Sequence, residues 1–194
     1  MGLLLQSMLA VITGLGLLAS ANNFVQLAAP SPAADTILDV IATHSTMASE
    51  ERYVYLRVFS DGTAEYQSSK HSDGVQNDLP VIRKTLRQDE FKRIRSILSE
   101  PKLAAVGPKY ATRYAIVDSW TEWTVKIQRS GQTQSIQVLE FSPGLARTMK
   151  HPYPDALVRL GCNIEKLRAD VSGETNSLHN DCKKALGMTD QPAS

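Results

Sequence analysis

The feature that most constrains the fold is a pair of segments in which apolar and polar residues alternate until a turn signal interrupts them. The first segment, residues 53 to 68, reads "YVYLRVFSDGTAEYQS". Val54, Leu56 and Val58 recur with the period of two that is typical of a half-buried strand. Asp61-Gly62 follows, and glycine accepts the positive φ that a tight hairpin turn requires. The segment therefore predicts a β-hairpin.

The second segment, residues 118 to 141, reads "DSWTEWTVKIQRSGQTQSIQVLEF" and predicts another hairpin. Ser130-Gly131 is its turn signal. The apolar residues that we expect on one face are Trp123, Val125 and Ile127 before the turn, and Ile136 and Val138 after it. The apolar parity then changes to Leu139 and Phe141, which indicates a bulge or the end of the pairing.

Each hairpin pattern is followed by a segment with helical spacing. In residues 86–100, "LRQDEFKRIRSILSE", the apolar positions are Leu86, Phe91, Ile94, Ile97 and Leu98. In residues 152–173, "PYPDALVRLGCNIEKLRADVSG", they are Leu157, Leu160, Ile164, Leu167 and Val171. Pro154 and Asp155 suit the first turn of this second helix, and Gly173 suits its end.

This order predicts an α+β fold with an antiparallel sheet of about four to five strands, formed by the two hairpins and a possible extra strand at "TILDVIATH". Two amphipathic helices should pack on one face of the sheet. We interpret residues 68–80, "SSKHSDGVQNDLP", as a surface loop and residues 102–117 as an irregular connection.

The first residues have the pattern of a secretory signal peptide. An uncharged apolar run is followed by Ala19-Ser20-Ala21, so we expect cleavage after Ala21. The run lacks basic residues before it, and a retained membrane anchor is the alternative. The predicted organisation is a signal peptide at 1–21, a flexible leader at 22–35, one domain at 36–186 and a disordered tail at 187–194, with no membrane span after cleavage.

Cys162 and Cys182 are the only cysteines. An even cysteine count in an exported chain favours a disulfide over a metal site. A bridge across about 20 residues contributes roughly 3 kcal/mol in the chain-entropy view. Because Cys162 lies away from the apolar stripe of its helix, the chain after Gly173 must fold back for Cys182 to reach it.

The arrangement of "VYLRVFSDGTAEY", "LRQDEFKRIRSIL", "DSWTEWTVKIQ" and "SIQVLEF" resembles uncharacterised secreted bacterial proteins with a hairpin-helix-hairpin core. The resemblance covers roughly Tyr53 to Val171 and is one of pattern. It implies no activity.

The sequence contains no motif for nucleophilic catalysis, metal hydrolysis or phosphate binding. We predict no catalytic residue, metal site or cofactor, and interpret the four histidines as solvated loop residues. A carboxylate pair, Asp118 and Glu122, could still perform acid and base chemistry. Trp123 belongs to the apolar face, whereas Trp120 has the opposite parity. Trp120 and Asp118 are therefore the candidate ligand-binding residues, because an exposed indole stacks on sugar rings or peptide side chains.

Between residues 83 and 113 there are nine basic residues and three acidic ones, an imbalance of 9 − 3 = +6. Lys92, Arg93 and Arg95 could form a face for an anionic partner, although such faces usually serve solubility. The whole chain carries a formal charge of only +1, and nucleic acid is not expected as a partner.

Together these features predict an exported soluble binding or interaction module, periplasmic or secreted, that is not an enzyme. Its partner would be an envelope or extracellular protein or polysaccharide. Two alternatives remain open. One is a small cell-wall or saccharide-active hydrolase or lyase that uses Asp118 and Glu122. The other is a secreted enzyme inhibitor whose contact loop is the segment 68–80.

Overall fold

The computed structural model describes residues 35–67, 80–111, 118–143, 153–174 and 178–188. The predicted signal peptide, nearly all of the leader and of the loop at 68–80, and most of the tail lie outside these residues. The strands are β1 (Thr36–Thr46), β2 (Glu50–Phe59), β3 (Thr63–Gln67), β4 (Val81–Thr85), β5 (Lys109–Ala111), β6 (Ser119–Arg129) and β7 (Gln132–Leu139). The helices are α1 (Gln88–Leu98), α2 (Pro101–Ala104), α4 (Asp155–Ser172) and α5 (Asn180–Ala185).

The strands form one seven-stranded sheet in the order β4-β3-β2-β1-β6-β7-β5. The α+β class is confirmed, but the expected sheet of four to five antiparallel strands was too small. β5 pairs in parallel with β7, so the sheet is mixed. β4 and β5 form its two edges. β5 comes from the segment that we had interpreted as an irregular connection, and β4 from residues 81–85, to which we had assigned no element.

Both predicted hairpins are present. β2 and β3 pair around Asp61-Gly62, and β6 and β7 pair around Ser130-Gly131. Ser130 has φ 43° and Gly131 has φ 81°, so both residues of the second turn are left-handed, as in the hairpin turns that match the twist of a sheet. The extra strand predicted at "TILDVIATH" is β1, which lies at the centre of the sheet between β2 and β6.

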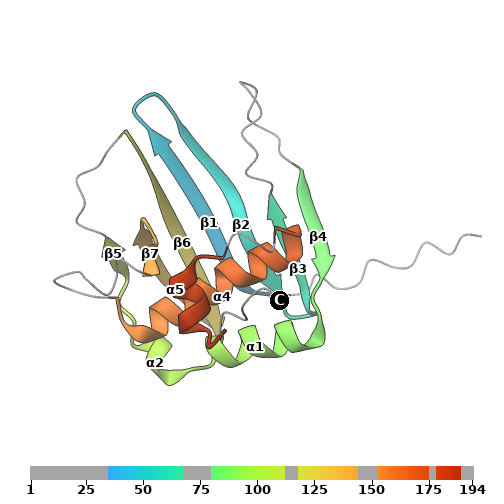
Figure 1. Ribbon diagram of the computed structural model, residues 1–194. Coiled ribbons are helices and arrows are strands. Elements are labelled where there is room, and N and C mark those ends of the chain that lie inside the picture. Colours follow the sequence, from blue (N-terminus) through green and yellow to red (C-terminus); the bar gives the residue numbers. More distant parts are fainter. Residues whose placement is uncertain (1–34, 68–79, 112–117, 144–152, 175–177, 189–194) are drawn as a thin grey trace, which may run out of the picture. The chain divides into compact units, whose positions relative to one another are not determined.

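One face of the sheet forms the core with the helices. The side chains predicted to share that face on β6 and β7 are all buried: Trp123, Val125, Ile127, Ile136 and Val138. Leu56 and Val58 of β2 join them and are fully buried. Figure 1 shows α1, α4 and α5 on this face, so the helices form a second layer on one side of the sheet.

The two predicted helices correspond to α1 and α4. Arg87 N donates a hydrogen bond to Glu90 Oε2 at 2.8 Å at the start of α1, so the side chain of the third helical residue caps this end of the helix. α4 begins after Pro154 and ends at Gly173, which has φ 83° and donates to the Ala169 carbonyl at 2.9 Å. These are the boundaries that proline and glycine predict.

The predicted disulfide joins Cys162 of α4 to Cys182 of α5, with an S–S distance of 2.05 Å. α5 folds back onto α4, and both cysteines are buried. A disulfide is compatible with an oxidising extracellular or periplasmic location. Among the helices of the described residues, none has the length and apolar character needed to cross a bilayer.

Candidate binding surfaces

The second face of the sheet is not covered by any helix of the described residues (Figure 1). Its side chains have the opposite parity to Trp123, Val125 and Ile127, and the strand register brings them together across β2, β1, β6 and β7. We call this surface the open face. Its polar and aromatic side chains include Asp39, Thr43, Arg57, Trp120, Glu122, Thr124, Lys126, Gln128, Thr133 and Ser135. Ile41, Ser45, Val54, Gln137 and Leu139 have the same parity, and Ile41 and Ser45 are buried between their neighbours.

Ion pairs organise the central part of the open face. Arg57 Nε donates to Asp39 Oδ1 at 3.0 Å, and Arg57 Nη1 lies 3.6 Å from Glu65 Oε2. Beside this pair is a hollow of about 250 Å³, lined by Thr36, Asp39, Arg57, Lys126, Gln128 and Thr133. The surface is thus polar and nearly balanced in charge, with hydroxyl and amide groups between the charged side chains.

Trp120 lies at the other end of the open face. It pairs with Ser45 of β1 across the sheet, and its side chain is half-buried. Asp118 is exposed and directly precedes β6. The structure therefore places both candidate ligand-binding residues at one end of β6, while Trp123 is only 6 % exposed and belongs to the core.

Asp118 and Glu122 are separated by four positions along an extended segment, which puts their Cα atoms roughly 13 Å apart at ~3.3 Å per residue. Carboxylate pairs that hydrolyse glycosides lie about 5 to 9.5 Å apart. Glu122 is half-buried and lies between Thr43 and Leu139 in the register, whereas Asp118 is exposed. The two side chains would have to turn toward each other to act on one bond, and a joint role for them stays a prediction.

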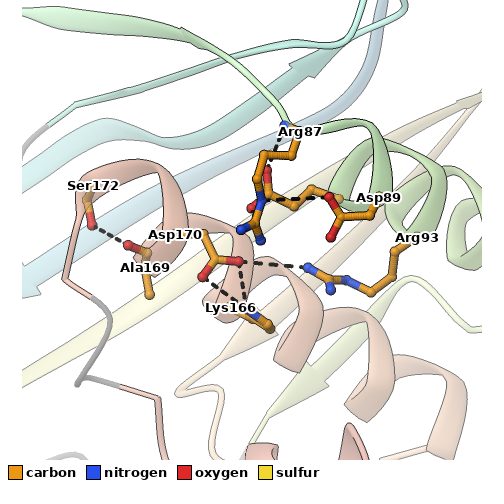
Figure 2. Close-up of polar contacts among 8 residues, drawn as sticks. Arg87, Asp89, Arg93, Lys166, Ala169, Asp170 and Ser172 are labelled. Atoms are coloured by element: carbon orange, nitrogen blue, oxygen red, sulfur yellow. Dashed lines mark hydrogen bonds and ion pairs between the residues drawn. The ribbon is translucent and has the colours of Figure 1, made fainter.

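The basic residues of α1 do not form one continuous face. Lys92 is exposed, but Arg93 turns toward α4, where its Nη2 lies 3.8 Å from Asp170 Oδ2 (Figure 2). Lys166 also forms an ion pair with Asp170, with 2.7 Å between Nζ and Oδ2. Arg95 lies over the Phe91 ring, 5.6 Å from its centre. The excess positive charge is therefore divided between a helix-to-helix contact and solvent.

A polar cluster that the sequence did not predict lies on the covered side of the sheet, where α4 faces β2 and β3. Tyr55 OH donates to Glu165 Oε2 at 2.9 Å. Arg168 is only 6 % exposed; its guanidinium lies 4.3 Å from the centre of the Tyr66 ring, and its Nη2 donates to the Gln67 carbonyl at 2.6 Å. The cluster ties α4 to the sheet through buried hydrogen bonds.

Burial controls the ionisation of this cluster. It raises the pKa of the Glu165 carboxyl above its usual value, although the hydrogen bond from Tyr55 and the charge of Arg168 act in the opposite direction. Burial and the neighbouring Glu165 also raise the pKa of Tyr55. The only sequence signal was the spacing of Glu165 and Arg168 along α4, which by itself indicates an exposed polar face.

Aromatic side chains continue from this cluster along α4. Tyr55 lies 4.9 Å from Trp123 and Trp123 lies 5.0 Å from Phe141, between ring centres. Tyr153 follows at 6.5 Å from Phe141, and burial raises its pKa to about 12. The row fills the space between the sheet and α4 and is part of the core.

Two of the histidines lie in the described part of the chain. His44 Nδ1 lies 3.1 Å from Thr121 Oγ1, and His179 Nδ1 accepts a hydrogen bond from Asp181 N at 3.2 Å at the start of α5. Within the described ranges, no group of three metal-ligating side chains comes together. The histidines at 71 and 151 lie outside them.

No protein-family model matches this chain, and comparison with curated proteins gives no match either.

Proposed function

We propose that this chain is an exported, soluble, non-enzymatic binding module that meets its ligand through the open face. The observation that carries the proposal is the asymmetry of the sheet, since helices cover one face and a polar surface with a half-buried tryptophan occupies the other. Function depends on sites, so the proposal rests on these side chains and not on the fold class.

Export is supported by two independent features. The apolar leader ends in a small-x-small pattern, and the Cys162–Cys182 disulfide suits an oxidising compartment. We place the protein in the periplasm or outside the cell on these grounds.

The chemistry of the open face favours a polysaccharide as the ligand. Thr124, Gln128 and Thr133 supply hydroxyl and amide groups, which exchange hydrogen bonds with sugar hydroxyls. The indole of Trp120 supplies an apolar plate for stacking. An envelope or extracellular protein is the other class of partner that such a surface could meet. The hydrolase alternative has less support, because the Cα atoms of Asp118 and Glu122 lie roughly 13 Å apart at ~3.3 Å per residue, and their side chains would have to converge to act on one bond.

Binding to envelope polysaccharide, measured by affinity electrophoresis, tests the proposal. Trp120→Ala should weaken binding about tenfold, or ~1.4 kcal/mol, because aromatic anchors dominate such contacts. Trp120→Phe should retain most of the affinity, since it keeps an aromatic plate. Ser96→Ala is the matched control, since it truncates an exposed side chain on α1, away from the open face.

Equal affinity of wild type and Trp120→Ala for every polysaccharide fraction would remove the open face as the ligand surface. Assays of saccharide cleavage and of binding with Glu122→Gln distinguish the enzymatic alternative from a binding role. Loss of saccharide cleavage in that variant, with binding intact, would replace a binding role by a catalytic one.

A further inference from the structure

A groove lies at the opposite end of β6 from Trp120, roughly 30 Å away along the strand at ~3.3 Å per residue. Its volume is about 460 Å³, within the range of small-molecule sites. Three elements form it: Ile37 of β1, the end of α1 with Arg95, Leu98 and Ser99, and the end of β6 with Gln128, Arg129 and Ser130.

Arg129 is the unusual residue of this groove. Its Nε and Nη2 atoms are buried and have no hydrogen-bond partner among the described residues, and its Nη1 makes one long bond of 3.4 Å to the Glu100 carbonyl. Buried donors on a charged group are costly when unpaired, and native proteins pair nearly all of them. Burial also lowers the pKa of Arg129, because partial removal from water disfavours the charged form of the guanidinium.

Among the ion pairs of the described residues, none involves Arg129. Glu100, whose carbonyl accepts the long bond from Arg129, uses its carboxylate for Arg159, at 2.5 Å between Oε2 and Nη2. Arg95, the second arginine of the groove, is exposed and contacts the Phe91 ring. By contrast, Arg87 and Arg93 on the same helix segment are paired with Glu90 and Asp170.

We propose that this groove binds a small organic oxyanion, with Arg129 and Arg95 holding the anionic group and Ile37 and Leu98 contacting the apolar part of the ligand. A guanidinium donates two parallel hydrogen bonds to a carboxylate, phosphate or sulfate, and a rotation of the Arg129 side chain into the groove gives its unpaired nitrogens such a partner. The hydroxyl of Ser130 and the amide of Gln128 are further donors at the rim.

The carbonyl end of α1 disfavours an anion, so binding depends on the two arginines and not on the helix. Substitution of either arginine should therefore reduce anion binding. The groove is also separate from the surface named in the proposed function, because the groove and Trp120 lie at opposite ends of β6.

Isothermal titration of the full chain with phosphate, sulfate, acetate and hexanoate at constant ionic strength tests the groove. We expect saturable binding of one anion per chain, with hexanoate at least tenfold tighter than acetate because the alkyl chain contacts Ile37 and Leu98. Phosphate and sulfate have no apolar part, so their binding shows whether the anionic group alone is enough for binding in the groove.

Arg129→Gln should abolish binding and Arg95→Gln should weaken it at least tenfold. Lys92→Gln is the matched control, because it removes an exposed charge one turn earlier on α1 and outside the groove. Without anion, Arg129→Gln should unfold at the same temperature as wild type or higher, since it removes unpaired buried donors. This measurement shows that the variant folds.

Failure of all four anions to bind saturably would overturn the proposal. So would equal loss of affinity in Lys92→Gln, which would indicate general charge attraction, or unchanged affinity in Arg95→Gln and Arg129→Gln. Acetate and hexanoate binding equally would overturn the role of the apolar part.

Discussion

Glu165 is a carboxyl group in surroundings that disfavour its charge. Burial raises its pKa, and the hydrogen bond from Tyr55 only partly offsets that effect. Arg168 lies in the same cluster, but its Nη2 donates to the Gln67 carbonyl, and its Nη1 has no hydrogen-bond partner in the described part of the chain. The cluster therefore links α4 to the sheet at an electrostatic cost that depends on pH.

The sign of that dependence follows from proton linkage. The folded protein keeps the Glu165 proton to higher pH than the unfolded chain does, so from about pH 4.5 upward the folded state binds more protons. The contribution of Glu165 to stability is thus greatest below that window and decreases as the pH rises through the raised pKa. Glu165→Gln removes this loss and still accepts a hydrogen bond from Tyr55.

Urea unfolding of wild type and Glu165→Gln at several pH values between 4 and 8 measures the effect. The stability of the variant relative to wild type should increase with pH. Glu50→Gln removes an exposed carboxylate from the strand that carries Tyr55 and serves as the control. A difference between wild type and Glu165→Gln that stays constant with pH would contradict the assignment.

At the scale of elements, α4 is the helix on which the core is built. It contacts the sheet on one side and α5 on the other, so residues around most of its circumference are buried. Phe141 packs directly on its backbone at Gly161, where an added Cβ would lie 2.1 Å from Phe141 Cζ. Glycine at this position lets the aromatic row approach the helix.

Gly161→Ala should therefore destabilise the protein by about 1 to 3 kcal/mol through overpacking, although alanine is the better helix former by ~1 kcal/mol. Free energies of unfolding from urea titration measure it. In a Phe141→Leu background the same substitution should be neutral or stabilising, because the ring is gone. An equal loss in both backgrounds would show that the ring contact is not the cause.

The sequence predicted the elements with strong periodicity and missed those without it. α1, α4 and both hairpins were predicted because their apolar residues follow one period. β4 reads "VIRKT", with exposed basic residues and no alternation, and β5 has three residues. Edge strands like these are defined by the neighbour to which they pair, so local pattern cannot reveal them.

The candidate sites were predictable only in part, for a similar reason. The parity of Trp120 followed from the alternation in β6, and the register with β1 bears it out. Arg129 has the parity of Trp123 and Ile127 and was not singled out, because its unpaired state depends on α1 and Glu100. The ligand roles of Trp120, Asp118, Lys92, Arg93 and Arg95 stay predictions.

At the scale of the whole molecule, one sheet separates two environments. Its covered face holds the helices, the aromatic row and the buried cluster, and α5 is fastened to α4 by the disulfide. Its open face presents polar side chains and Trp120. Our proposal that this scaffold binds a ligand outside the reducing cytoplasm depends first on export of the chain.

N-terminal sequencing and intact mass of the protein recovered from a bacterial host test that claim most directly. We predict a mature chain that starts at Asn22, is found outside the cytoplasm and is lighter by two hydrogen atoms than its reduced form. An intact chain from Met1 in the cytosol, with a Cys162 thiol that reacts with a labelling reagent, would contradict it.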